Sequence, residues 1–194
     1  RILVHLTSIS PDKKSSSGYY GRLPLTWSNI LSSSSLWLHI LVESLSKGIE
    51  VELTSLVLGN LLGDDSAAQQ VFRTVSLNFK ESMVASLVRS VSPATPTAAW
   101  TLTNMIRNDT VSYAGFYCSE SLLSASRLIL WLREPSIATQ TSWMIASLTA
   151  REEQTAHYLC QEQNPSFLSA LLLSAQNPVQ QDQTVPLEIG RAHV

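Results

Sequence analysis

Apolar residues recur along most of this chain at the three- and four-residue spacing of an α-helix. The pattern is clearest at residues 36–45, 83–91 and 122–132. Shorter amphipathic stretches follow at residues 66–75, 111–118 and 152–160. Turn-forming clusters of Gly, Pro, Asn and Asp separate these stretches, and no segment keeps up the period of two that a half-buried strand requires. The pattern therefore predicts an all-α protein.

A seven-residue motif also repeats without gaps. Its copies occupy residues 56–62, 100–106 and 143–149. Asn60 lies 44 residues before Asn104, and Ser147 lies 43 residues after Asn104. A fourth copy at residues 3–9 requires an insertion, which the polar residues 10–22 supply as a loop. A long apolar stretch precedes each of the three copies and a shorter one follows it, so the repeating unit is predicted to contain a short, a medium and a longer helix.

Three-helix units of this length are typical of armadillo and HEAT proteins. One such unit cannot bury its apolar side alone, so neighbouring units stack into a continuous core. We expect a right-handed superhelical armadillo solenoid over residues 1–187. Its approximate units are 1–10 (partial), 24–64, 65–108, 109–152 and 153–187 (partial).

Both ends of the chain are predicted to be artificial. The first residue is Arg1 and not Met, so we expect a fragment of a longer protein. Residues 189–194 back-translate into a widely used sequencing-library adapter, and we expect residues 188–194 not to be native. His193 therefore has no functional weight.

Composition excludes several classes of function. The 13 basic and 15 acidic residues give a formal charge of −2, unlike the basic excess of a strongly electrostatic nucleic-acid binder. We therefore expect no nucleic-acid partner. Two cysteines are too few for a disulfide framework and suit a reducing compartment. No apolar run reaches the roughly 18 residues of a membrane span, so no membrane partner is expected.

The repeated motif resembles importin-α, the armadillo family of nuclear import receptors. Trp100 and Asn104 have the Trp-x-x-x-Asn spacing of that family's long helices, and residues 58–64 are similar to its Leu-Gly-Asn segment ending in Gly-Asp. Trp143 matches a later repeat that keeps Trp and lacks Asn. The resemblance covers residues 36–175 and implies an adaptor that holds basic nuclear-localisation signals in a concave groove. It further implies action in the cytoplasm and nucleus, and contact with importin-β through a basic N-terminal segment that is missing here.

The chemistry of such a groove follows from the residue types. Trp100 and Asn104 are one helical turn apart and share a face. An Asn amide donates and accepts, so it can clamp a peptide backbone. Neighbouring indoles leave slots for the stems of Lys or Arg and attract the cation, while acidic groups at the slot mouths select basic peptides. The predicted peptide-binding residues are therefore Asn60, Asp64, Trp100, Asn104 and Trp143.

Some positions depart from the importin-α pattern, and other interpretations stay open. Leu56 stands in place of a Trp, and Leu3 and Thr7 stand in place of a Trp and an Asn. The tryptophans could be core residues, the asparagines solvated amides, and Asp64 the N-cap of a helix beginning near Ser66. The alternatives in function are an armadillo or HEAT scaffold for another partner and a helical domain associated with an enzyme. An acidic groove and exposed indoles would favour the import receptor over the scaffold.

No catalytic constellation is present in the sequence. The seven glycines form no phosphate loop, and no serine has a recognisable base partner. His157 and Cys160 share a helix face, but two ligands are not enough for a zinc site. We therefore expect a binding protein with no enzymatic activity, no cofactor and no metal.

Overall fold

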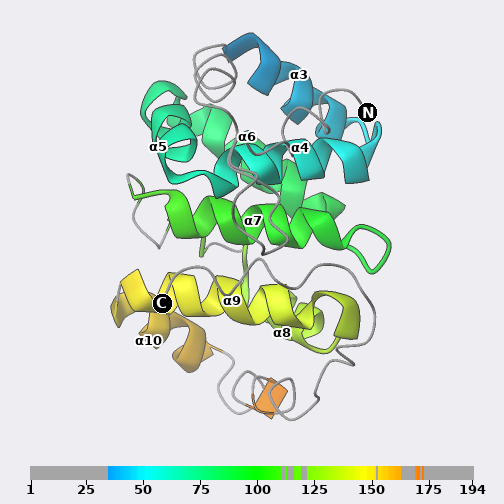
Figure 1. The fold of residues 1–194 in the computed structure, drawn as a ribbon. Helices are drawn as coiled ribbons and strands as arrows, with labels where there is room; N and C mark the ends of the chain where they lie inside the picture. Colours follow the sequence, from blue (N-terminus) through cyan, green and yellow to red (C-terminus); the bar gives the residue numbers. More distant parts are fainter. Residues whose placement is uncertain are drawn as a thin grey trace, which may run out of the picture.

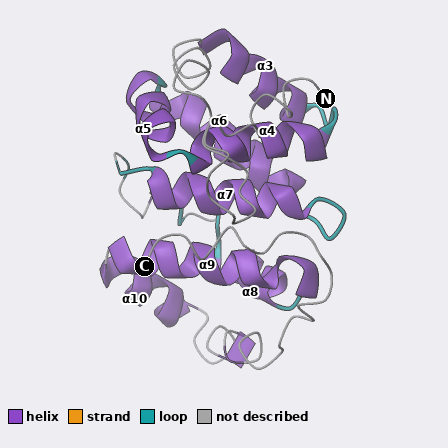
Figure 2. Cartoon of the chain, viewed as in Figure 1, coloured by secondary structure: helices purple, strands orange, loops and turns teal. Residues whose placement is uncertain are grey.

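Every regular element of the described structure is an α-helix (Figure 1, Figure 2). The computed structural model describes residues 35–110, 112, 116–118, 122–151, 153–162, 169–170 and 172. Within these ranges the one β-type contact is an isolated bridge between Ser92 and Thr95. The all-α prediction is confirmed for this part of the chain. The helices are α3 (Ser35–Ser46), α4 (Val51–Gly63), α5 (Asp65–Thr74), α6 (Leu77–Ser90), α7 (Pro96–Asn108), α8 (Ala125–Leu132), α9 (Pro135–Arg151) and α10 (Glu153–Glu162).

Local sequence signals explain where several helices begin. The Ser76 hydroxyl accepts a hydrogen bond from the Phe79 N–H at the start of α6, and Ser124 accepts one from the Arg127 N–H at the start of α8, both at 3.3 Å. Such side-chain oxygens replace the backbone partner that the first turn of a helix lacks. Pro96 opens α7, where the absence of its N–H costs nothing.

Three stretches differ from the sequence prediction. Helix α6 begins six residues before the predicted residue 83, because Ser76 caps its first turn directly before Leu77. Helix α8 begins three residues after the predicted residue 122, directly behind its own Ser cap. Of the predicted short helix at residues 111–118, the structure describes Ser112 and residues 116–118, and none of these is α-helical. The Ser112 N–H is instead bound by the Asp109 carboxylate at 3.0 Å, which closes a turn.

Helices α4, α7 and α9 each carry one copy of the repeated motif and form a central row (Figure 1). They lie side by side in that order and run in the same direction. Helix α3 packs on α4 and α6, α6 also packs on α7, and α5 contacts α4 and α7. Helices α8 and α10 both pack on α9. One continuous apolar core lies between these helices, with Leu58, Leu102, Met105 and Met144 among its fully buried members.

Polar side chains of α7 bind the backbone of α4 along the whole contact. We term this set of hydrogen bonds the α4–α7 ladder. Three of its steps run to carbonyls of α4: Thr101 to Ser55 (2.7 Å), Asn104 to Gly59 (3.0 Å) and Asn108 to Leu62 (2.6 Å). In the fourth, Thr97 donates to the Glu52 carboxylate (2.6 Å) and lies 3.5 Å from the Glu52 carbonyl. The partners of every step are 45 or 46 residues apart, and the residue numbers increase in the same direction along both helices. The ladder therefore holds the two helices parallel and in one register.

Several predictions concern residues outside the described ranges. These are the motif copy at residues 3–9, the partial unit at 1–10, the non-native tail at 188–194 and most of the last partial unit. The helices of the central row end at Gly63, Asn108 and Arg151, close to the unit ends expected at 64, 108 and 152. The division into units stays a prediction.

The ladder predicts a cost for deleting one of its steps. Asn108→Ala should lower the free energy of unfolding by about 1–3 kcal/mol, because the Leu62 carbonyl loses its partner in a buried contact. Asn78→Ala makes the same change at an exposed position of α6 and should cost less than about 0.5 kcal/mol. Urea denaturation followed by circular dichroism measures both. Equal effects of the two substitutions would contradict a stabilising ladder.

Candidate functional site

The motif residues of the central row lie in different environments. Trp143 on α9 is 53% exposed, whereas Trp100 on α7 and Leu56 on α4 are half-buried. Asn60 on α4 is half-buried, but Asn104 on α7 is only 3% exposed. The row therefore presents one projecting indole, on α9, and one recessed indole, on α7.

Trp100 is recessed because its ring lies on α4 at Gly59. A Cβ atom at position 59 would stand 2.1 Å from Cζ3 of the ring, so only a hydrogen atom fits there. The Trp100 indole N–H is shielded from solvent and has no hydrogen-bond partner. The ring is thus part of the helix contact on one side and part of the surface on the other.

Asn104 also reaches Gly59. Its amide nitrogen donates to the Gly59 carbonyl at 3.0 Å as the third step of the α4–α7 ladder. The alternative interpretation of Asn104 as a solvated amide is therefore wrong, because α7 lies close enough to α4 for the side chain to bind the neighbouring main chain. A role of Asn104 in peptide binding stays a prediction.

Asp64 stands at the junction of α4 and α5. Its carboxylate accepts a hydrogen bond from the Ala67 N–H at 2.9 Å and caps α5, so the capping interpretation of this residue is confirmed. A carboxylate at this position also favours the helix through the partial positive charge of the first turn. Selection of basic peptides by Asp64, and binding of a peptide by Asn60, stay predictions.

Short side chains follow Trp143 on its face of α9, and the longer Gln140 lies one turn before it. Thr139 precedes it by one turn, and Ala146 and Ala150 follow it by one and two turns. Ala146 and Ala150 are exposed and Thr139 is half-buried. The two exposed alanines cover little of the indole on its C-terminal side, and the ring is accessible to solvent.

Charge is sparse along the central row. Among the side chains described on α4, α7 and α9, the exposed charged ones are Glu52 and Arg107. Acidic residues lie instead at the junction with α5, where Asp64 caps the helix and Asp65 is exposed. The exposed charges described on the row are therefore one acidic and one basic. Exposed acidic residues lie near both ends of α4, at Glu52 and Asp65, and at Glu153 directly after α9, but none is described along the middle of the row.

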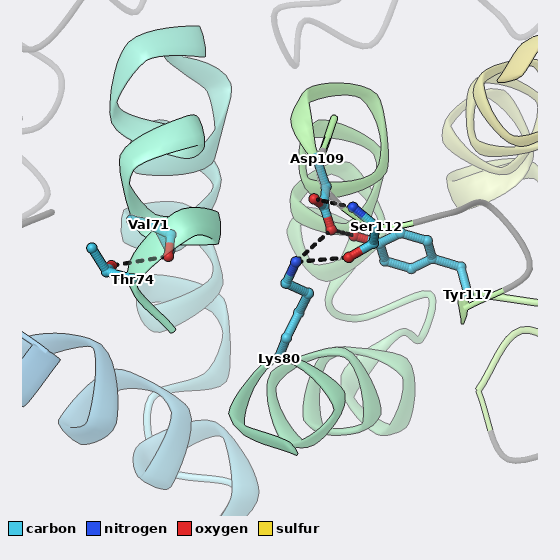
Figure 3. A network of polar contacts seen from close by, with 6 residues as sticks. All are labelled: Val71, Thr74, Lys80, Asp109, Ser112 and Tyr117. Carbon is cyan, nitrogen blue, oxygen red and sulfur yellow. Dashed lines mark hydrogen bonds and ion pairs between the residues drawn. The ribbon is translucent and has the colours of Figure 1, made fainter. Parts of the chain in front are cut away.

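A buried ion pair joins α6 to the segment after α7 (Figure 3). Nζ of Lys80 lies 3.0 Å from Oδ2 of Asp109 and 2.7 Å from the Ser112 hydroxyl, and both charged side chains are almost fully buried. The Tyr117 hydroxyl donates to the same Asp109 oxygen at 2.6 Å. The Lys80 ammonium also lies 5.0 Å from the centre of the Phe72 ring. Each charge thus has several partners, and together they tie the end of α7 to α5 and α6.

The environment of Asp109 changes its titration. Burial alone would raise the pKa of this carboxyl, because the carboxylate loses its water. Hydrogen bonds from Tyr117, Ser112 and Lys80 favour the ionised form more strongly, so the pKa of Asp109 is lowered from its ordinary value.

Sequence reasoning missed this network. The available signal is Lys80, which shares a helix face with the buried Val84 and Leu87. A charge on an apolar face needs a buried partner. The pattern does not identify that partner, because Asp109 lies 29 positions away in a turn.

Comparisons with known proteins do not assign the chain to a family. The chain matches no protein-family model, and neither curated proteins nor solved structures gave a match. The similarity to importin-α therefore rests on the motifs alone and stays a prediction. In the part of the chain that the structure describes, no helix is long and apolar enough to cross a membrane. The same residues contain no group of three or more His, Cys, Asp or Glu that could hold a metal ion.

The buried and the exposed ion pairs should respond differently to loss of the lysine. Lys80→Met should lower the free energy of unfolding by about 3–5 kcal/mol, because Asp109 keeps its charge in a buried site without a cation. Lys47→Met, which breaks the exposed pair with Glu43, should change it little. Urea denaturation at neutral pH compares the two. A small effect at Lys80 would show that the buried pair contributes nothing.

The lowered pKa of Asp109 also predicts that the folded protein loses stability in acid. Its lowered pKa means that the folded state binds fewer protons than the unfolded state. The contribution is complete above the ordinary Asp pKa of about 3.9 and is lost as the pH falls through the folded value. Asp109→Asn should therefore be less stable than the wild type near pH 6, by a margin that narrows between about pH 5 and 3. Urea denaturation across this range measures the margin, and a constant margin would contradict the assignment.

Proposed function

We propose that this chain is a protein-binding adaptor whose ligand lies in extended form across α4, α7 and α9. The observation that carries the proposal is the position of Trp100 and Trp143 on neighbouring parallel helices, with Trp143 projecting into solvent. Parallel helices at regular spacing offer side chains at regular intervals, which suits the repeating backbone of an extended peptide.

The proposed architecture is a right-handed armadillo solenoid in which α4, α7 and α9 are the long helices of successive units. The spacing of the ladder partners supports it. They are 45 or 46 residues apart, within the length of an armadillo or HEAT unit.

The proposed ligand is a basic nuclear-localisation signal, on the resemblance to importin-α. An exposed indole attracts a Lys or Arg side chain with roughly 0.5–2 kcal/mol and accommodates its alkyl stem. The exposure of the Trp143 ring, with only alanines exposed after it on its face, supports this contact. Asn60 would supply an amide for the peptide backbone, and Asp64 and Asp65 would supply acidic groups at one end. In this proposal the protein works in the cytoplasm and nucleus and contacts importin-β through a segment outside the 194 residues.

A scaffold for a partner without a basic signal is the second candidate. Two observations favour it over the import receptor. The described side chains of the central row carry little exposed charge, and the Asn104 amide nitrogen is engaged by Gly59. A nearly neutral surface with one projecting Trp suits an apolar or aromatic anchor of a partner protein.

Binding of a labelled peptide tests the proposal. A fluorescein-labelled Lys/Arg-rich peptide is titrated with the 194-residue chain, and fluorescence anisotropy gives the dissociation constant. Trp143→Ala should weaken binding roughly tenfold, within the range of a cation–π contact. Trp37→Ala is the matched control, because Trp37 is 44% exposed on α3, outside the central row, and its loss should leave the affinity unchanged.

A second peptide separates the two candidates. In it, Gln replaces every Lys and Arg. Saturable binding of the basic peptide alone, weakened by Trp143→Ala, supports the import receptor. Equal binding of both peptides supports the scaffold. No binding of either peptide by a chain that is helical by circular dichroism refutes the peptide-binding proposal.

A further inference from the structure

Gly59 is the point on α4 at which both side chains of the Trp100–Asn104 pair converge. The Trp100 ring lies against the α-carbon of Gly59, and the Asn104 amide binds its carbonyl oxygen. Trp100 and Asn104 are four residues apart on one face of α7, so a single residue of the neighbouring helix receives both.

Any side chain at position 59 would disturb this arrangement. A Cβ atom there would lie 2.1 Å and 2.5 Å from Cζ3 and Cε3 of Trp100 and 2.7 Å from the Thr101 hydroxyl. The Trp ring is rigid and cannot bend away, so it would have to turn off α4 or push the helices apart. The Thr101 hydroxyl is bound to the Ser55 carbonyl at 2.7 Å, so moving it would break a step of the ladder.

The geometry points to Gly59 as the positioning residue of the central-row surface, a role that rests on the proposed peptide-binding function. Because Gly59 has no side chain, the Trp100 ring can lie directly against α4. Trp100 therefore stays recessed, and its indole N–H stays shielded from solvent. Trp143 then remains the projecting aromatic group of the row. An extended peptide can approach α4 and α7 closely beside Trp143, and a raised Trp100 ring would block that approach. Gly59 therefore selects a ligand that lies flat across the three helices.

Gly59→Ala tests this role, with Ser55→Ala as the matched control. Position 55 is one turn earlier on α4 and buried, and its hydroxyl has no hydrogen-bond partner, so its loss should be tolerated. The first measurement is solvent exchange of the Trp100 indole N–H by NMR, with the resonance assigned from Trp100→Phe. The second is the affinity for the fluorescein-labelled Lys/Arg-rich peptide. Gly59→Ala should speed indole exchange and weaken peptide binding, each by roughly tenfold or more, and Ser55→Ala should alter neither.

The double variant Gly59→Ala/Trp100→Ala keeps the test decisive if Gly59→Ala alone fails to fold. With the ring absent the two closest contacts disappear and the Thr101 contact remains. The double variant should therefore be more stable than Gly59→Ala and should bind the peptide as Trp100→Ala alone does. A double variant that is no more stable than Gly59→Ala would overturn the role assigned to Gly59, as would unchanged indole exchange or unchanged affinity in folded Gly59→Ala.

Failure of the proposed function gives a different result. If the wild-type chain binds no peptide, the peptide-binding proposal is refuted. Indole exchange in Gly59→Ala then still decides whether Gly59 holds Trp100 in its recessed position.

Discussion

The close approach of α7 to α4 at Gly59 is the contact on which the central row depends. Four polar side chains of α7 use it to reach main-chain carbonyls of α4. A shift of one residue along either helix would separate all four pairs at once, and buried polar groups that lose their partners are costly. The ladder therefore specifies both the parallel direction and the register of the two helices, which apolar packing alone would define less sharply.

The buried ion pair determines where α7 ends. Asp109 follows the last residue of α7 and holds Lys80 of α6, so the helix is tied to α4 along one face and to α6 at its C-terminal end. Burying two charges costs free energy. The hydrogen bonds that Lys80 donates to the Ser112 hydroxyl and that Tyr117 donates to Asp109 offset part of that cost. The two sets of polar contacts thus constrain α7 from different directions, and with it the position of Trp100.

The properties of the surface follow from these constraints. Trp100 is recessed because Gly59 has no side chain to keep the ring away from α4. Asn104 is buried because the same close approach of the helices brings the Gly59 carbonyl within hydrogen-bond distance. Trp143, on the next helix of the row, has exposed alanines near it and projects into solvent. A binding surface with one recessed and one projecting indole differs from a uniform ladder of indoles, and it gives Trp143 the larger share of any contact with a partner.

Local patterns along the chain were enough to predict the helical class and the helices that carry the motif. Apolar periodicity and helix caps are local properties, and residues 56–62, 100–106 and 143–149 all lie in α-helices of the central row as their spacing predicted. The alternative role of Asp64 as a helix cap was also accessible, because a cap and its partner are three residues apart. The environments of Trp100, Asn104 and Lys80 could not be predicted from local patterns, because they depend on how the helices pack. Their partners lie 29 to 45 positions away in the chain, and the distance between two packed helices depends on residues of both, which no local pattern contains.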